Sequence, residues 1–321
     1  MPPCEAADSC LLCGSPGTKV LFSATDRLYG TTEKPFQVVK CRECGFARLS
    51  PAPCAEELAA YYPDHYWFEP DNSATGRLEE RYRRLLVRDH VGFVVRALRE
   101  SGEAGPVLDV GCGGGLFLGI MRERGAAVLG LDRSPDAASL AWRRHGVPAV
   151  CGDLVTAPLA GESCAAITMF HVVEHLPDPK AYLRAAHSLL RPNGRLIVQV
   201  PNIGCWQFAL LGASWNGVDV PRHLYNFRPP DLAAILESCG FTVLRRKQFS
   251  WRDNPAGLAT SLAPRLEPVA RRVRAADRSA FSKLAKDAAY FAMVLAAVPF
   301  ALTEAAFGAG STVMMEARKS A

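Results

Sequence analysis

The 321-residue chain lacks the features that mark secreted or membrane-spanning proteins. Its first residues, Met1 to Glu5, include no basic segment followed by an apolar run, so no secretory signal is expected. The longest apolar run, Ala288 to Leu302, is shorter than the roughly 18 residues that cross a bilayer, and Pro299 interrupts it. We therefore expect no transmembrane span. This run is interpreted as a buried or lid helix, with weak peripheral membrane contact as the alternative.

Internal repeats, low-complexity tracts and a strong excess of one charge sign are also missing from the sequence. A hydrophobic share of 49% and a charged share of 21% are ordinary for a globular enzyme and exclude a disordered chain. The net charge of +5 is concentrated in two stretches, Arg77 to Arg99 and Arg265 to Asp287, each with seven basic and three acidic residues. Such stretches usually form solvated helix faces, but they can also attract phosphate-bearing substrates, nucleic acid or a membrane surface.

The eleven cysteines lie in a large chain without a secretory signal, which favours metal binding in a reducing cytoplasm over disulfides. Two C-x-x-C-G segments stand out, and the thiolates of such a segment can share one tetrahedral metal while the glycine supplies a turn with positive φ. Two pairs provide four ligands and leave no open coordination position. We predict a structural zinc site with the ligands Cys10, Cys13, Cys41 and Cys44, against the alternative of unliganded thiols.

Strand and helix signals divide the chain into three regions. Residues 1–70, rich in Cys, Pro and aromatic residues, form the predicted zinc-binding module, and residues 71–104 form a polar linking helix. From residue 105 to residue 321, apolar strands alternate with helices, a rhythm that predicts a parallel sheet with helices on both faces. Residues 251–309 are predicted to be a helical insertion before the last strand.

A glycine-rich loop is the sharpest signal in the sequence. The segment VLDVGCGGG, residues 107–115, places glycines between a buried strand and a helix, where they allow a tight turn and close approach of a ligand. Two features separate it from a dinucleotide-binding loop. Leu116 occupies the place of the third glycine of that pattern, counted from Gly111. Asp109 adds a carboxylate that would repel a pyrophosphate and attract the cationic ammonium or sulfonium of S-adenosylmethionine.

Two further acids follow the next strands along the chain. Asp132 closes the second strand, where a carboxylate can accept hydrogen bonds from ribose hydroxyls, and Asp153 follows the third strand. The carboxyl edge of a parallel sheet is where ligands bind in this architecture. Each acid taken alone could be a helix cap or a solvated turn. Three acids at consecutive strand ends predict a ligand site.

These motifs, in this order and spacing, resemble class I S-adenosylmethionine-dependent methyltransferases over about residues 105–250. The resemblance rests on the segments Val107 to Leu118, Leu129 to Asp132, Gly152 to Leu154, His171 to Leu176 and Arg191 to Arg195. It implies a doubly wound α/β fold, Rossmann-like, with a seven-stranded sheet whose last strand is antiparallel. The strands predicted at residues 241–249 and 310–318 fit the final pair of that sheet.

The resemblance also assigns cofactor contacts residue by residue. Asp109 and the loop glycines Gly111 and Gly113 would hold the methionine end, and Asp132 would bind the ribose. The adenine would be flanked by Asp153 and Leu154.

The N-terminal region resembles a subgroup of these enzymes that carries a zinc-binding segment. The similarity lies in residues 41–51 and in the aromatic residues between Tyr61 and Phe68, which could stack on a substrate or pack between domains. Members of that subgroup often methylate sugars or other small metabolites in biosynthetic clusters.

Histidines supply the candidate bases, because an oxygen or nitrogen acceptor benefits from removal of its proton near neutral pH. His171 directly follows the fourth strand and is the first candidate, while His175, one helical turn later, could equally be a packed residue. His223 is the second candidate and lies beside Arg222, which could grip a phosphate or carboxylate.

A small-molecule methyltransferase is the function that these features predict. The segment at residues 170–173, Phe-His-Val-Val, is not the Asn/Asp-Pro-Pro-aromatic tetrad of enzymes that methylate flipped bases. The basic stretches also lack interleaved aromatic residues that would stack on bases. Nucleic acid is therefore not expected as a partner. An RNA methyltransferase and a non-catalytic zinc protein that binds the cofactor remain the alternatives, and the oligomeric state stays open.

Overall fold

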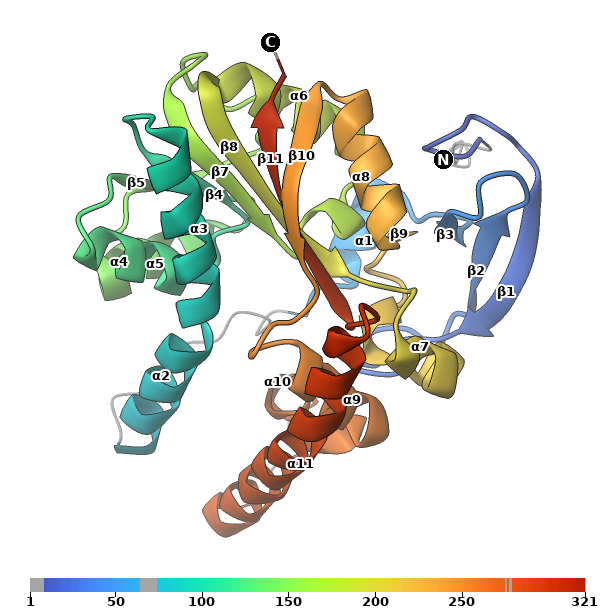
Figure 1. The fold of residues 1–321 in the computed structure, drawn as a ribbon. Coiled ribbons are helices and arrows are strands. Elements are labelled where there is room, and N and C mark those ends of the chain that lie inside the picture. The colour runs from blue at the N-terminus through green and yellow to red at the C-terminus, as the bar shows by residue number, and fades with distance from the viewer. Residues whose placement is uncertain (1–8, 64–73, 275, 277–278, 321) are drawn as a thin grey trace.

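The computed structural model describes residues 9–63, 74–274, 276 and 279–320, which form two sheets of different size (Figure 1). The larger sheet has the strand order β10-β11-β8-β7-β4-β5-β6. Its strands are β4 (Val107–Val110), β5 (Val128–Asp132), β6 (Ala149–Cys151), β7 (Cys164–Phe170), β8 (Leu190–Pro201), β10 (Phe241–Lys247) and β11 (Thr312–Lys319). The first five pair in parallel, whereas β11 runs antiparallel to both β8 and β10. The predicted seven-stranded, doubly wound sheet with an antiparallel last strand is confirmed.

Helices cover both faces of the large sheet. They are α3 (Arg88–Ser101), α4 (Leu116–Glu123) and α5 (Pro135–His145) on one face, and α6 (Pro179–Leu189) and α8 (Pro229–Ser238) on the other. Neighbouring residues of one strand alternate between the two cores, as Val107 and Leu108 do. Strands buried on both faces need apolar residues at every position, which explains their unbroken hydrophobic runs.

The linking helix is divided into two. The structure has α2 (Ala74–Leu86) and α3 (Arg88–Ser101), with Val87 between them and Gly102 in the left-handed region at the end of α3. The helix predicted for residues 71–104 is therefore a pair of consecutive helices.

A second, four-stranded antiparallel sheet carries the cysteines. Its order is β1-β2-β3-β9, with β1 (Thr18–Ala24), β2 (Phe36–Cys41), β3 (Ala47–Ser50) and β9 (Tyr225–Asn226), and a short helix α1 (Ala55–Ala60) follows β3. The fourth strand comes from the segment between β8 and α8, far along the chain, and the Leu49 amide also donates to the Leu224 carbonyl at 2.9 Å. The N-terminal region is thus joined to the large domain through a shared sheet.

The predicted helical insertion before the last strand is confirmed. It consists of α9 (Asn254–Leu262), the 3₁₀ turn η4 (Pro264–Leu266), α10 (Pro268–Val273) and α11 (Ala280–Ala306). The remaining short elements are α7 (Trp206–Leu211) and the 3₁₀ turns η1 (Val173–His175), η2 (Gly212–Ser214) and η3 (Asn216–Val218). In Figure 1, α11 projects away from the sheet on the same side as α2.

The apolar run in this insertion belongs to a longer helix than the sequence predicts. The helix continues through Pro299 and extends past Lys283 and Lys286 toward its N-terminus, because charged side chains interrupt an apolar run without ending a helix. Residues Phe281–Ala306 are therefore long and apolar enough to cross a membrane by length and composition alone. The prediction that this apolar segment is too short to span a bilayer was therefore wrong.

Candidate active site

A cavity of ≈ 1180 Å³ opens at the carboxyl edge of β4, β5 and β7. Its walls come from the glycine loop, from Asp109 and Asp132 at the ends of their strands, and from His171 and His175 after β7. The N-terminal region contributes Leu58, Ala59 and Tyr62 to another part of the wall, and α2 and the insertion contribute arginines. Six of the eight predicted cofactor-binding and catalytic residues therefore meet around one cavity.

The glycine loop takes a backbone path that other residues would resist. Gly111, Gly113 and Gly115 have φ values of 73°, 52° and 76°. A Cβ atom at Gly111 would lie 2.7 Å from Val172 Cγ2, and one at Gly115 would lie 2.7 Å from Ala141 Cβ. The loop can thus follow the cavity wall only without side chains, which leaves its backbone open to a ligand.

Two buried carboxylates stand beside this loop. Asp109 accepts a hydrogen bond from Thr168 Oγ1 at 2.6 Å, and Asp132 accepts from the amides of Gly113 and Ser134, both at 2.9 Å. Burial raises the pKa of Asp109 to about 7, the bond from Thr168 opposes that rise, and the nearby Asp132 adds to it. Burial also raises the pKa of Asp132. A cationic ligand would relieve this unfavourable negative charge, so the residues present fit the sulfonium and ammonium of S-adenosylmethionine.

The predicted adenine-side residues are placed differently from each other. Gly152 and Leu154 line the cavity, but Asp153 does not. The Asp153 carboxylate accepts hydrogen bonds from the Tyr182 hydroxyl and from the amide of Val155. Leu154 is thus positioned for the predicted contact, whereas the Asp153 side chain fixes its own turn.

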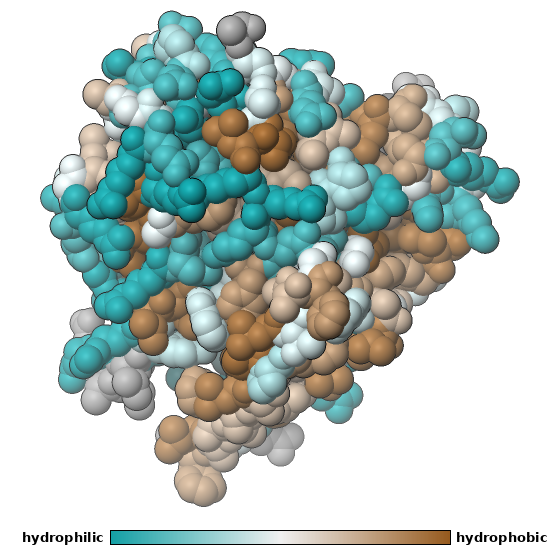
Figure 2. Space-filling model, viewed as in Figure 1, coloured by the Kyte–Doolittle hydropathy of each residue, from teal (hydrophilic) through white to brown (hydrophobic). Residues whose placement is uncertain are grey.

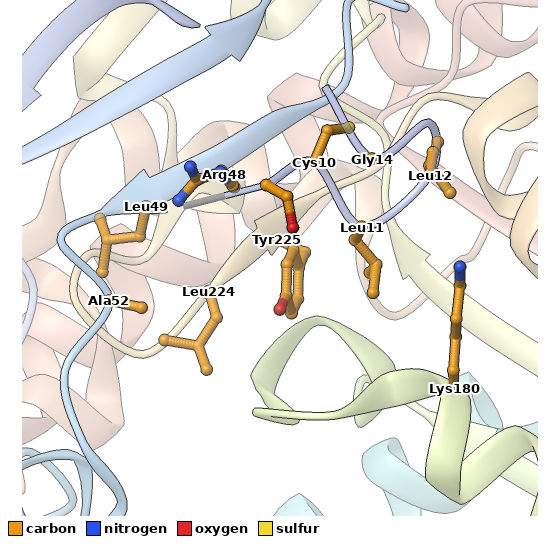
Figure 3. Close-up of a pocket in the computed structure, with 11 residues that line it drawn as sticks. Cys10, Leu11, Leu12, Gly14, Arg48, Leu49, Ala52, Lys180, Leu224 and Tyr225 are labelled. Atoms are coloured by element: carbon orange, nitrogen blue, oxygen red, sulfur yellow. The ribbon is translucent and has the colours of Figure 1, made fainter. Parts of the chain in front are cut away.

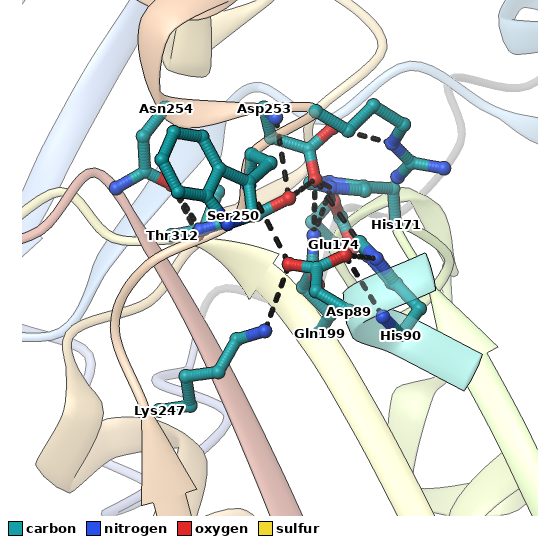
Figure 4. A network of polar contacts seen from close by, with 12 residues as sticks. Asp89, His90, His171, Glu174, Gln199, Lys247, Ser250, Asp253, Asn254 and Thr312 are labelled. Carbon is teal, nitrogen blue, oxygen red and sulfur yellow. Dashed lines mark hydrogen bonds and ion pairs between the residues drawn. The ribbon is translucent and has the colours of Figure 1, made fainter. Parts of the chain in front are cut away.

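His171 lies between two carboxylates (Figure 4). Its Nδ1 is 3.2 Å from Glu174 Oε1, and its Nε2 is 3.5 Å from Asp253 Oδ2 and 2.8 Å from Gln199 Nε2. Burial lowers the pKa of His171, but Asp253 and Glu174 outweigh it and raise this pKa to about 9. An amide nitrogen can only donate, so in this arrangement Nε2 accepts from Gln199 and the ring proton on Nδ1 is donated to Glu174. Both ring nitrogens are thus engaged, which leaves His171 no free lone pair for the predicted role of base.

Sequence reasoning missed the residues that hold His171. Asp253 belongs to the insertion, and it accepts hydrogen bonds from Gln199 Nε2 and Ser250 Oγ, both at 2.7 Å. Gln199 lies on β8 in the middle of an apolar run, with its side chain fully buried. A polar residue inside such a strand is the one signal that could have pointed to this network.

His175 lines the cavity and keeps one ring nitrogen free. Its Nδ1 lies 3.0 Å from the Arg222 carbonyl oxygen, an acceptor only, so the proton sits on Nδ1 and Nε2 keeps its lone pair. The Tyr62 hydroxyl lies 2.9 Å from the same Nδ1. Burial and the neighbouring His223 lower the pKa of His175 to about 4, so its ring is neutral near pH 7.

His223, the second predicted base, is packed behind His175 rather than in the cavity wall. The two rings meet edge to face with centroids 4.6 Å apart, and His223 Nδ1 lies 2.8 Å from the Gly217 carbonyl oxygen. Ligand atoms of Glu174, His175 and His223 lie within 4.8 Å of one another, a spacing that a metal ion could also use. Glu174 Oε2 is buried and has no hydrogen-bond partner among the described residues.

Arg222, which the sequence suggested as a grip for a substrate phosphate or carboxylate, is fully buried. Its guanidinium donates to both oxygens of Asp26 at 2.9 Å and to Asp219 at 2.6 Å. It therefore ties the N-terminal region to the segment before β9 and has no free side to offer a substrate.

The predicted metal cysteines form a compact cluster. Sγ atoms of Cys10 and Cys44 lie 3.5 Å apart, those of Cys13 and Cys41 lie 3.6 Å apart, and all four are within 4.8 Å of one another. Tetrahedral zinc with Zn–S bonds of about 2.3 Å needs sulfurs roughly 3.8 Å apart, so the donor set fits zinc. The backbone amides of Cys44 and Glu43 lower the pKa of Cys41 to about 6, although its burial opposes them.

A smaller cavity of ≈ 360 Å³ lies beside this cluster (Figure 3). Cys10, Leu11 and Tyr225 line it together with Arg48 and Lys180. The predicted aromatic contacts at His65 to Phe68 lie outside the described residues. Tyr61 and Tyr62 are described, and only Tyr62 reaches the large cavity.

Comparison with known proteins places the large domain. The chain matches the family described as "Methyltransferase domain" over residues 77–246. It is 33% identical over 149 residues to "Ubiquinone biosynthesis O-methyltransferase" of Pseudomonas paraeruginosa (strain DSM 24068 / PA7), covering 43% of this chain and 64% of that protein. It is 36% identical over 147 residues to the protein of the same name from Xanthomonas axonopodis pv. citri (strain 306), covering 42% and 61%. The chain thus spans less than two thirds of the length of these relatives.

Solved methyltransferase structures are similar as well. An S-adenosylmethionine-dependent methyltransferase from Archaeoglobus fulgidus has 19% sequence identity and a TM-score of 0.48, covering 77% of this chain and 100% of that one. Magnesium protoporphyrin IX methyltransferase from Synechocystis PCC 6803 has 16% identity and a TM-score of 0.45, covering 79% and 90%. The match to the methyltransferase family extends over more than half of the sequence. The chain therefore belongs to the family of class I S-adenosylmethionine-dependent methyltransferases.

Proposed function

We propose that the enzyme methylates a small-molecule acceptor, such as a sugar, a nucleotide sugar or a secondary metabolite. The observation that carries this proposal is the ≈ 1180 Å³ cavity, which is larger than a typical single-ligand pocket and so can hold donor and acceptor together. Arginines of α2, among them Arg77 and Arg81, line the same cavity, which favours an acceptor with a phosphate or carboxylate. The curated relatives are named O-methyltransferases, which favours a hydroxyl group as the methylated atom.

His175 is the proposed base. S-adenosylmethionine, when bound, supplies the methyl group as an electrophilic carbon on a sulfonium. His175 is neutral, lines the cavity and carries its lone pair on Nε2, so it can take the proton of an acceptor hydroxyl. His171 would hold the cavity wall in place through Glu174 and Gln199. Asp109 and the glycine loop would orient the cationic donor, and alignment of the two reactants supplies much of the rate.

Transfer of a labelled methyl group tests the function and the base together. Purified enzyme with methyl-labelled S-adenosylmethionine is expected to label a small-metabolite extract but neither total RNA nor total protein. His175→Gln should lower the rate of labelling by about 10²- to 10⁴-fold, because general-base catalysis contributes that much, while donor affinity is retained. His187→Gln, a histidine on α6 that packs against Phe241 outside the cavity, is the matched control and should keep the wild-type rate.

Two results would contradict these assignments. Label in RNA would replace the acceptor class and make the basic helices the binding surface. A pH profile of kcat with both reactants saturating separates the histidines. With His175 as base, kcat stays flat between pH 6 and 8, because its pKa of about 4 leaves it unprotonated throughout. A base role for His171 instead requires kcat to rise with pH toward about 9.

Zinc is the proposed occupant of the four-cysteine cluster, and its role is proposed to be structural. Four thiolates close the coordination sphere and leave no position for a substrate. The cluster joins the turn before β1 to the turn between β2 and β3, so it holds the smaller sheet together. The cytoplasm is the proposed location, because a reducing compartment keeps such thiols unpaired.

Metal analysis checks the zinc proposal. Purified protein should contain one zinc per chain, and a strong chelator should lower the melting temperature, because the free energy of metal binding contributes to folding. Cys13→Ser should remove the zinc and lower the melting temperature. Cys151→Ser, which changes another exposed cysteine, should do neither. Loss of turnover after chelation with an unchanged melting temperature would mean that the metal takes part in the chemistry.

A further inference from the structure

The helical insertion has an apolar part and a charged part. Figure 2 shows apolar side chains covering the part of the molecule where α11 projects in Figure 1. The charged part lies at the start of the insertion, where Arg252 and Asp253 directly precede α9. Both residues lie beyond the segment 77–246 that matches the methyltransferase family. Their part in the active site is therefore not implied by that match.

Arg252 lines the large cavity, and one side of its guanidinium is fixed there. Nε donates to Asp253 Oδ1 at 2.7 Å, while Asp253 Oδ2 accepts from Gln199 Nε2 and Ser250 Oγ, both at 2.7 Å. Because Gln199 is a buried residue of β8, the pair is anchored to the central sheet. The terminal nitrogens of Arg252 form no hydrogen bond within the described part of the chain, and its side chain is 37% exposed. The arginine is thus held in place with N–H groups that can bind an anion.

Arg252 and Asp109 line the same cavity, and their charges interact. Burial raises the pKa of Asp109, and Arg252 is the cation among the described residues that opposes this rise. Burial lowers the pKa of Arg252, but carboxylates outweigh it and raise this pKa; Asp253 contributes most, and Asp109 is among the others. The donor end of the cavity therefore offers one carboxylate and one guanidinium near each other.

The donor carries the complementary pair of charges. Its methionine end is an α-amino acid, with a cationic ammonium and an anionic carboxylate on the same carbon atom. Standard bond lengths place the carboxylate oxygens about 3 Å from the ammonium nitrogen. The buried charge of Asp109 attracts the ammonium but repels the carboxylate, and a low-dielectric wall strengthens both effects. A donor bound at Asp109 therefore needs a cation nearby for its carboxylate.

We propose that the terminal nitrogens of Arg252 bind the α-carboxylate of S-adenosylmethionine, so that Asp109 and Arg252 together hold the two charged groups of the methionine end. The planar fork of a guanidinium matches the two oxygens of a carboxylate. Asp253 is then a positioning residue, because it fixes the guanidinium at the cavity wall. This assignment concerns the donor alone and depends neither on the acceptor nor on the identity of the base.

An anionic group of the acceptor is the rival partner of Arg252. The cavity wall already provides Arg77 and Arg81 of α2 for such a group. Neither of these two arginines is among the charges that shift the pKa of Asp109, whereas Arg252 is. Arg252 is thus the arginine placed for the reactant whose ammonium lies at Asp109.

Calorimetric titration of the intact enzyme with two ligands tests the proposal. S-adenosylhomocysteine, the product left after methyl transfer, has the same amino acid end as the donor, and its decarboxylated analogue lacks only the carboxylate. Arg252→Met should weaken the binding of S-adenosylhomocysteine by about 10- to 100-fold, because charge-assisted hydrogen bonds are lost, but should not weaken the binding of the analogue. Arg252→Lys should retain part of the affinity, since it keeps the charge without the planar fork. Arg246→Met, an exposed arginine of β10 outside the cavity wall, is the matched control and should bind both ligands like the wild type.

The comparison of the two ligands separates a lost contact from a damaged site. Retained binding of the analogue and an unchanged melting temperature show that the fold and the rest of the donor site are intact, and Arg252→Lys gives the same comparison if the methionine variant does not fold. An equal loss of affinity for both ligands would overturn the proposal, because Arg252 would then act only through Asp253. Wild-type affinity for S-adenosylhomocysteine together with a raised KM for the acceptor would assign the arginine to the acceptor, and wild-type affinity without that change would leave it no ligand.

Discussion

Arg222→Met is expected to lower the free energy of unfolding by about 3–5 kcal/mol, because it leaves buried carboxylates without their cation. The guanidinium is fully buried and forms two parallel hydrogen bonds with Asp26 as well as a bond to Asp219. It also donates to the Tyr61 carbonyl at 3.0 Å and lies 4.6 Å from the centre of the Tyr29 ring. Removing the arginine therefore leaves several partners unsatisfied at once.

Chemical denaturation of wild type and variant measures this loss. Arg96→Met, which breaks the exposed ion pair with Glu100, is the control and should unfold like the wild type. Burial raises the pKa of Asp26, but Arg222 outweighs it and holds that pKa well below its usual range. The stabilisation is therefore present above about pH 4 and is lost as the pH falls. If Arg222→Met unfolds like the wild type but no longer methylates the acceptor, Arg222 has the substrate-binding role predicted from the sequence.

Asp109→Asn is expected to act in opposite directions on donor binding and on stability. Loss of the buried negative charge should weaken S-adenosylmethionine binding at least about thirtyfold, because breaking a buried charge pair typically costs 2–5 kcal/mol. The ligand-free variant should nevertheless be more stable than wild type at pH 8, by roughly 2–4 kcal/mol. Asparagine keeps an oxygen that can accept the Thr168 hydrogen bond but avoids the cost of a buried charge.

The pH dependence of stability fixes the direction of the stability change expected for Asp109→Asn. Burial raises the pKa of Asp109 to about 7, above its usual value near 4. Ionising it therefore costs wild type stability as the pH rises from about 4 to 7, and the advantage of the variant should vanish toward pH 4. Calorimetric donor titration and melting curves at several pH values measure both effects. Asp136→Asn, an exposed acid at the cavity rim, should change neither. A destabilised Asp109→Asn would contradict the account.

Local signals account for what the sequence predicted correctly. The cysteine pairs and the glycine loop each depend on residues a few positions apart, so their local geometry is visible in the sequence. The alternation of strands and helices predicted a parallel sheet covered on both faces, because the burial of both sheet faces is recorded in each strand. The resemblance to the family supplied the seven strands and the antiparallel last strand. Asp109 and Asp132 were placed correctly at the cavity because parallel strands end at the same edge.

The features that the sequence could not reveal depend on contacts between distant segments. Arg222 contacts Asp26, which lies 196 positions earlier in the chain. Nothing in the sequence around Arg222 distinguishes it from a substrate-binding arginine. Asp253 reaches His171 from the insertion, and this contact raises the pKa of a histidine that was predicted to be the base. The helical pattern of α11 was hidden because its charged first turns shortened the apolar run.

Under the proposed function, the mixed origin of the cavity wall separates donor recognition from acceptor choice. The glycine loop and its acids lie inside the segment shared with the methyltransferase family, whereas Leu58, Ala59 and Tyr62 lie outside it. Selection on the N-terminal segment can therefore change which acceptor fits without disturbing the donor site. For the same reason, the acceptors of relatives that share only the family segment are a poor guide to the acceptor of this enzyme.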